Sequence, residues 1–242
     1  MAALCVALAL PAAAEQPRKI AVLSIIGDRM TIVSHVADTG TRVDRDRREY
    51  LEMPARVLDN AVLGAMQAAL KRGAPGTEVI MLGATPQLFA AQGEAVEDPD
   101  VKPVVDLVKP VIEKAGITQL VLVTKLRHDA MLRMADGYVG SGRLDGLGFY
   151  LDHQLPTEER GEGNPGRGFI APFAYLRVSL VDVASGQVSG RRDVLASQAV
   201  GAGRSKSLMV WEALSAEEKV RLVMGLARKE AAEAATALVG QP

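Results

Sequence analysis

The chain has 242 residues, of which 48% are hydrophobic and 4% aromatic, and its formal net charge is −1 at pH 7. This composition supplies a sizeable core, while the even mixture of charges excludes an extended basic surface for nucleic acid or anionic lipid. Beyond residue 14 no apolar stretch reaches the roughly 20 residues that cross a bilayer, so we expect no membrane span. We expect residues 15–242 to form a single α/β domain.

Residues 1–14 have the pattern of a secretory signal peptide. An apolar run ends at Pro11 and is followed by Ala12-x-Ala14, which matches the hydrophobic region and cleavage site of such a peptide. The usual positive start is missing, which a start codon assigned too late would explain; the alternative is an ordinary buried N-terminal segment. We therefore predict export and a periplasmic or secreted mature protein.

The single cysteine, Cys5, lies inside this predicted signal peptide. A lipid-modified cysteine follows a small residue, whereas Cys5 follows Leu4, so we expect no lipid anchor. Removal of the segment would leave the mature chain without a thiol nucleophile, a disulfide or a Cys-ligated zinc.

The first half of the chain alternates between strand and helix patterns. Runs of apolar and β-branched residues predict strands at 19–26, 30–36, 77–82 and 119–125. The first two are expected to be joined by a tight turn, and the continuous apolar run of the last suggests the sheet centre. Apolar positions spaced three and four apart predict helices at 51–71 and 104–115. The charged stretch 38–49 has no apolar period and is interpreted as a solvated loop.

The second half begins with a glycine-rich segment, 136–168, which we expect to be a long loop, either functional or mobile. A strand with alternating apolar residues follows at 170–180, and a hairpin turn leads to a partner strand at 187–200. Ser215 and Glu218 form a capping-box pattern before a closing helix. The order β-β-α-β-α-β-loop-β-β-α predicts an α/β (α+β) fold, a mixed β-sheet with packed helices.

No residue pattern identifies catalytic or metal-ligating side chains. The three histidines, His35, His128 and His153, lack zinc-ligand spacing and are interpreted as surface residues. We therefore predict that the chain is not an enzyme and holds no metal and no cofactor. A hydrolase that uses Asp145, Asp152 or His153 is the lowest-ranked alternative.

Two glycine-rich stretches resemble known loop motifs in composition but do not match their sequence patterns. The stretch 140–148 matches neither a dinucleotide-binding loop nor a nucleophile elbow, and 201–207 lacks the glycine that precedes lysine in a phosphate loop. Arg204 and Lys206 in the second stretch are candidate anion contacts; the alternative is a flexible connection after the hairpin.

Most of the few aromatic residues gather within or just after segment 136–168. Tyr138, Phe149 and Tyr150 are the candidate binding residues there, because tyrosine on a glycine-rich loop supplies contact area and a hydroxyl group at low entropic cost. The alternative is that these side chains fix the loop to the sheet.

A resemblance rests on the strand opening at 18–23, the helix at 51–71 and the stretch 180–188, which has the form L-x-D-x-x-[ST]-G-x-V. Together they resemble the α/β domain shared by curli-secretion lipoproteins, penicillin-binding-protein activator lipoproteins and the amino-terminal domain of the Tol-system periplasmic protein. The resemblance implies a non-catalytic envelope module that works by contacting other proteins. It transfers no site residues, and segment 136–168 departs from the pattern.

Two functions follow as hypotheses. The first is a non-catalytic periplasmic protein-interaction or assembly module of the bacterial envelope, with envelope proteins as partners. The alternative is a periplasmic small-molecule-binding protein whose ligand lies under segment 136–168.

Overall fold

The computed structural model describes residues 18–36, 46–93, 97–98, 100–158, 165–202 and 209–240. The predicted signal peptide at 1–14 lies outside these ranges. In chain order the elements are β1 (Lys19–Ser24), β2 (Arg29–Ser34), β3 (Arg47–Glu52), α1 (Val57–Gly73), β4 (Glu78–Leu82), α2 (Pro86–Gln92), α3 (Lys102–Lys114), β5 (Gln119–Lys125), β6 (Arg127–Asp129), β7 (Leu132–Met134), β8 (Gly137–Val139), β9 (Arg143–Glu158), β10 (Pro165–Asp182), β11 (Val188–Ser197), β12 (Val200–Gly201), the 3-10 helix η2 (Val210–Ala213) and α4 (Ala216–Val239).

The strands form one mixed sheet and a separate hairpin of β7 and β8. The path through the sheet is β3-β2-β9-β10-β5-β1-β4; β11 and β12 pair with β10, and β6 pairs with β9. β1 runs parallel to β4 and β5, whereas β10 runs antiparallel to β5, β9 and β11. The predicted α/β class, a mixed sheet with packed helices, is confirmed.

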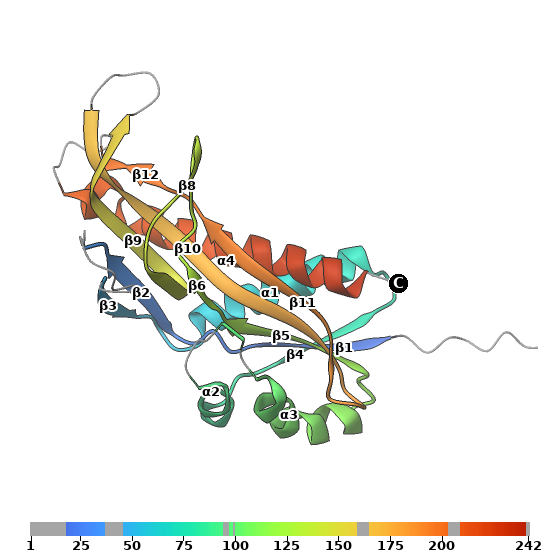
Figure 1. Cartoon of the computed structure of the whole chain (residues 1–242). Coiled ribbons are helices and arrows are strands. Elements are labelled where there is room, and N and C mark those ends of the chain that lie inside the picture. The colour runs from blue at the N-terminus through green and yellow to red at the C-terminus, as the bar shows by residue number, and fades with distance from the viewer. Residues whose placement is uncertain are drawn as a thin grey trace, which may run out of the picture.

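The long strand β10 joins the two halves of the sheet, as Figure 1 shows. Its residues Leu176–Asp182 pair with β5, and residues from Pro165 to Tyr175 pair with β9. β5 lies between β1 and β10, and its residues from Leu120 to Val123 are fully buried. Its continuous apolar run is therefore explained by contact with side chains on both faces of the sheet.

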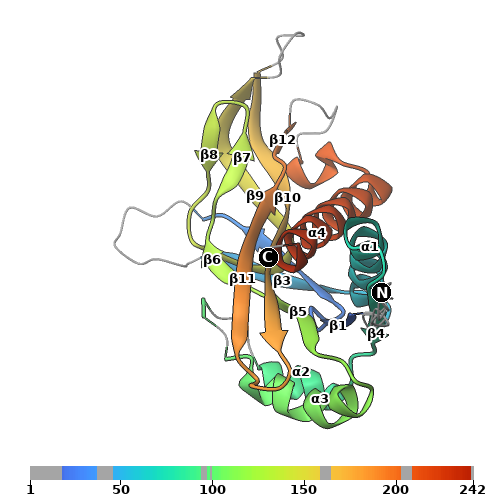
Figure 2. The ribbon, with the colours of Figure 1, turned by 90° about the vertical axis from the view of Figure 1, so that its right-hand side faces the viewer.

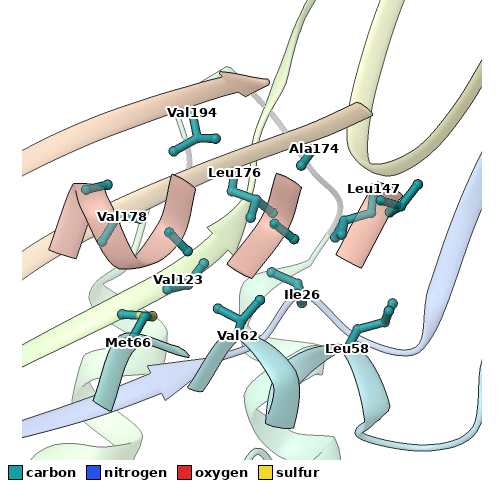
Figure 3. Close-up of a cluster of buried hydrophobic side chains, with 14 of the residues drawn as sticks. Ile26, Leu58, Val62, Met66, Val123, Leu147, Ala174, Leu176, Val178 and Val194 are labelled. Carbon is teal, nitrogen blue, oxygen red and sulfur yellow. The ribbon is translucent and has the colours of Figure 1, made fainter. Parts of the chain in front are cut away.

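Helices cover both faces of the sheet around β1 and β5 (Figures 1 and 2): α1 and α4 lie on one face, and α2 and α3 on the other. On the first face Leu58, Val62 and Met66 of α1 pack toward Val123 of β5 and Leu176 of β10 (Figure 3). A third cluster of buried residues lies where β9 and β10 meet β2 and the β7–β8 hairpin. Within the described residues, no helix combines the length and apolarity needed to span a membrane.

The closing helix α4 begins at the predicted capping box. Ser215 Oγ accepts a hydrogen bond from the Glu218 N–H at 3.2 Å, and the Glu218 carboxylate accepts one from the Ser215 N–H at 2.9 Å. Its buried stripe is rich in small residues, among them Ala227, Ala231 and Ala234. Small side chains at these positions allow the helix to pack closely on the sheet and on α1.

Segment 136–168, predicted to be a loop, is mostly strand. It contains β8, β9 and the beginning of β10, while residues 159–164 lie outside the described ranges. Its glycines serve close packing and irregular pairing: a Cβ on Gly148 would lie 1.8 Å from the carbonyl oxygen of Thr31 on β2. Gly168 has a φ of +90° at a register shift between β9 and β10, as in a β-bulge. The prediction was wrong because glycine marks both loops and such strand positions.

The N-terminal predictions need three further corrections. The two first strands exist but are not neighbours, because β1 lies between β4 and β5 while β2 lies between β3 and β9. Part of the charged stretch 38–49 is β3, which pairs with β2; residues 37–45 lie outside the described ranges. Leu51 belongs to β3 and the helix begins at Val57. The helix α2 was not predicted; Thr85 caps it by accepting a hydrogen bond from the Leu88 N–H.

Candidate binding groove at the sheet edge

The strand β11 is an open edge of the sheet, since within the described residues it pairs with β10 alone. In an antiparallel pair, alternate residues direct their backbone N–H and C=O groups toward the partner strand. The Gln198 N–H donates to the Pro172 carbonyl of β10 at 3.1 Å, and Ala196 is opposite Ala174 in the same register. Even-numbered residues of β11 therefore bond to β10. The odd-numbered residues Arg191, Asp193 and Leu195 present their N–H and C=O groups to the open edge.

A groove of about 640 Å³ follows this edge. Residues Arg192–Ser197 of β11 form its floor, and the β7–β8 hairpin and α4 form its two walls. Figure 2 shows β11 between the hairpin and α4. The open backbone groups of the strand therefore lie in a channel rather than on a flat surface.

The hairpin wall is attached firmly to the sheet. The N–H of Arg133 in β7 donates to Ser197 Oγ at 2.8 Å, and the N–H of Ala199 donates to the Arg133 carbonyl at 3.3 Å. The buried Tyr175 hydroxyl accepts from the Met131 N–H at 2.7 Å, and burial raises the pKa of this hydroxyl to about 12. These bonds close the edge at its Ser197 end and hold Tyr138, on β8, over the groove with 62% of its surface exposed.

The α4 wall combines small side chains with carboxylates. Ala234 and Ala237 leave space beside β11, and Glu230 and Glu233 line the same wall. Lys229 pairs with both carboxylates, at 3.1 Å and 3.8 Å. The wall therefore offers apolar room with acidic groups beside it.

A buried arginine on the neighbouring strand β10 fixes the position of the edge strand β11. Arg177 of β10, only 5% exposed, donates through Nε and Nη2 to the two oxygens of Asp193 at 2.6 Å and 2.8 Å. Its Nη1 donates to Asp98 at 2.8 Å, and Arg191 donates to the same carboxylate. The hydrogen bond to Asp193 raises the pKa of the Arg177 guanidinium, with burial acting in the opposite direction. Such a bidentate pair holds the strand in one geometry before any partner arrives.

The predicted binding residues fall in three different places. Tyr138 is exposed and lines the groove. Phe149 and Tyr150 are buried at 1% and 0% exposure, so neither side chain is accessible to a partner in this structure. Phe149 packs edge-on against Trp211 with ring centroids 5.4 Å apart, and the Tyr150 hydroxyl accepts a hydrogen bond from the backbone of a neighbouring loop. Both therefore fix their strand to the core, which is the alternative weighed for them.

Arg204 and Lys206, the candidate anion contacts, lie outside the described residues. Arg177, Glu230 and Glu233 were not identified from the sequence. The sequence signal for the Arg177–Asp193 pair is Arg177 itself, a charged residue inside an alternating strand pattern, because a buried arginine is usually found with a partner.

One cluster has the residue types of a hydrolytic triad but not its geometry. Ser141 Oγ lies 2.9 Å and Asp46 Oδ1 3.0 Å from the same atom, Nδ1 of His35. A serine–histidine–aspartate relay needs the two contacts on different ring nitrogens. The cluster therefore positions the ring, which stacks on Tyr150, and does not form a proton relay.

The aspartates of the hydrolase alternative do not come together in one site. Asp145 and Asp152 lie seven positions apart on β9, which corresponds to about 23 Å along an extended strand. Asp145 pairs with Arg48 at 3.0 Å, and Asp152 accepts two backbone hydrogen bonds from the residues that follow it. In the part of the chain that the structure describes, no group of three His, Cys, Asp or Glu residues is arranged to hold a metal.

No family model matches this sequence, and no curated protein matches it. Solved structures show distant similarity. PelC from Paraburkholderia phytofirmans, crystallised as a dodecamer, is 10% identical over 96% of this chain and 94% of its own, with a TM-score of 0.35. Protein CT253 from Chlamydia trachomatis is 11% identical over 92% and 95%, with a TM-score of 0.38. Lipoprotein GNA1162 from Neisseria meningitidis is 12% identical over 81% and 92%, with a TM-score of 0.32. At TM-scores this low, the similarities carry no argument about the function of this chain.

Proposed function

We propose that this chain is a non-catalytic protein-interaction or assembly module of the bacterial envelope, and that it receives an extended strand of a partner protein on the open edge of β11. The observation that supports this is the open backbone groups of Asp193 and Leu195, which lie in a groove with walls on both sides, and those of Arg191, which continue the same edge just outside the groove lining. Addition of a strand to a sheet edge satisfies such groups and supplies affinity through main-chain hydrogen bonds.

The two walls of the groove favour binding of a single partner strand over pairing with the sheet edge of another folded domain. Neighbouring strands in a sheet lie about 4.8 Å apart, so one added strand fits beside β11 between α4 and the hairpin. A second copy of this chain would have to bring its own α4 and hairpin into the same channel together with its β11, so we infer that a single segment is the better occupant. The occupant is therefore an extended peptide segment of another protein.

The walls also indicate which side chains the segment carries. Residues that face α4 meet Ala234 and Ala237, so small or apolar side chains fit there. Glu230 and Glu233 on the same wall carry one negative charge more than Lys229 balances, which favours a basic residue in the partner because opposite charges across an interface steer association. Tyr138 on the facing wall supplies an amphipathic contact surface.

The envelope location rests on the predicted signal peptide at 1–14 and on the resemblance to envelope α/β domains. An exported partner with a flexible, extended segment fits both. The small-molecule alternative remains a hypothesis, now without its expected covering loop, because segment 136–168 is mostly strand.

Site-specific crosslinking tests the proposal. A photo-reactive residue in place of Tyr138, in the full-length protein in intact cells, should capture a partner. Capture should fall in the double variant Glu230→Arg with Glu233→Arg and in Arg191→Pro, which removes an edge N–H that β10 does not use. A matched charge reversal on the opposite face, Glu113→Arg on α3, should leave capture unchanged.

Hydrogen exchange on the complex with the captured partner separates edge addition from other contacts. Bound partner should slow exchange at the amides of Arg191, Asp193 and Leu195 and leave the even-numbered amides of β11 as they were. A partner that protects a different surface, or capture that is equal in all variants, would contradict the proposed strand addition.

A further inference from the structure

The carboxyl ends of β1 and β5 form a second place where a ligand can be held. β1 lies between β4 and β5, and all three strands are parallel. The connection to β4 passes through α1 on one face, and the connection from β4 to β5 passes through α2 and α3 on the other. The two connections thus diverge at this edge of the sheet, beside β1 and β5 (Figure 1). In open α/β sheets ligands bind in the crevice at such a switch point.

A cavity of about 250 Å³ occupies this crevice. It is lined by Ile25–Arg29, which follow β1, by Lys125 at the end of β5, by Phe89 and the C-terminal end of α2, and by Glu52 of β3. At about 30 Å³ for each water molecule, this volume corresponds to roughly eight waters, so it suits a small ligand.

The backbone amides of the crevice are already occupied by an internal carboxylate. Asp59, in the first turn of α1 and 2% exposed, accepts hydrogen bonds from the N–H of Ile26 at 2.9 Å and of Gly27 at 3.2 Å. It also accepts one from Ser24 Oγ at 2.6 Å. Burial raises the pKa of this carboxyl, against the effect of these bonds. A phosphate cradle built from loop amides is therefore not open here.

Lys125 is the most enclosed charged group of the crevice. Within the described residues its Nζ makes no hydrogen bond or ion pair, although the side chain is largely enclosed. Gly146 makes room for the side chain, because a Cβ there would lie 2.9 Å from Lys125 Cδ. An enclosed ammonium group without a directly bonded counter-ion is costly, and an anion in the cavity would reduce that cost.

The charges around Lys125 come from several elements. Burial lowers the pKa of the Lys125 ammonium first, and Arg29 of β2 lowers it further by repulsion. Asp145 of β9, Asp59 of α1 and Asp28 of the β1–β2 turn act in the opposite direction. The two cations both line the cavity, so an anion between them would favour both charged forms.

We propose that this cavity binds a small carboxylate monoanion, held by Lys125 Nζ and the Arg29 guanidinium. The acidic groups of Asp28 and Glu52 on the cavity lining disfavour a dianion such as phosphate. Phe89 supplies an apolar wall for a short alkyl group. The site is separate from the β11 groove, and its test does not depend on the proposed strand addition.

Nuclear magnetic resonance of the full chain, with lysines labelled by reductive ¹³C-methylation, tests this site. Lys125 is assigned by its absence in Lys125→Met, and acetate, propionate and inorganic phosphate are titrated separately. We expect acetate or propionate to shift the Lys125 resonance saturably and to raise its pKa. Loss of one charge-assisted hydrogen bond should weaken binding about tenfold in Arg29→Gln. Lys114→Met, an exposed lysine on α3, should bind as the parent does.

Two outcomes overturn the proposal. No change in the Lys125 resonance with any of the three anions would mean that this lysine only balances Asp59. A response to phosphate without a response to the carboxylates would refute the selection for a monoanion. Because Arg29 is exposed, Arg29→Gln reports on binding even where Lys125→Met fails to fold.

Discussion

Gly148 tests how closely β2 and β9 approach each other. It lies opposite Thr31 in the parallel β2–β9 pairing, and an added Cβ would lie 1.8 Å from the Thr31 carbonyl oxygen and 2.7 Å from its carbon. Because these atoms are backbone, the strands must separate. Gly148→Ala adds the strain of overpacking, about 1 to 3 kcal/mol, and weakens about two strand hydrogen bonds of about 1 kcal/mol each. We expect a loss of about 3 to 5 kcal/mol in the free energy of unfolding.

Urea denaturation followed by circular dichroism measures this loss, and hydrogen exchange at Thr31 and Val33 locates it. The matched control is Gly64→Ala on the exposed side of α1, where a Cβ meets nothing within 4 Å. Alanine is the better helix residue, so this control should gain about 0.5 to 1 kcal/mol. If the free energy of unfolding of Gly148→Ala lies within about 1 kcal/mol of the parent value while the control behaves as expected, the close approach of the two strands is refuted.

Three further perturbations have definite expected outcomes. Arg177→Met should lower the free energy of unfolding by about 2 to 3 kcal/mol, because Asp193 loses a charged hydrogen-bond partner; urea denaturation measures it, and an unchanged midpoint would contradict the role of this pair. Ser215→Ala should cost about 1 kcal/mol through loss of the cap of α4, and Ser215→Asp should restore most of it. Asp59 has a raised folded-state pKa, so the folded chain binds its proton more tightly than the unfolded chain does. The stability of the parent relative to Asp59→Asn should therefore fall as the pH rises from about 3.8 through that raised pKa; a rise over this range would show that hydrogen bonding outweighs burial.

Local patterns predicted α1, α3, α4 and six of the strands, whereas α2, β3 and the strands from β6 to β9 were not predicted. The capping box at Ser215 and Glu218 begins α4 because both of its hydrogen bonds join residues within one turn. The strand predicted at 119–125 was found with these bounds and lies between two other strands, since a continuous apolar run is stable only where both faces are covered. The class, a mixed sheet with packed helices, follows from the order of such patterns.

The candidate sites depend on contacts between residues far apart in the chain, and sequence patterns carry little information about these. Asp59 interrupts the apolar stripe of α1, which signals a buried partner, but only the fold places it on the amides after β1. Tyr138 was singled out as a binding residue, yet its place beside the groove depends on how the β7–β8 hairpin is attached to β11.

Segment 136–168 shows most clearly the difference between what local sequence determines and what tertiary contacts determine. Its glycines are equally compatible with a loop and with strands, because a missing Cβ permits both chain reversal and close strand approach. The tertiary contact distinguishes the two: β2 lies against Gly148, so the residues around Gly148 form β9, a strand of the sheet. In the same way, the hairpin turn predicted after the strand at 170–180 indicated a partner strand at 187–200, which is β11. Only the tertiary structure decided that β11 is an open edge between α4 and a hairpin, because edge and centre differ in their long-range partners and not in their local sequence.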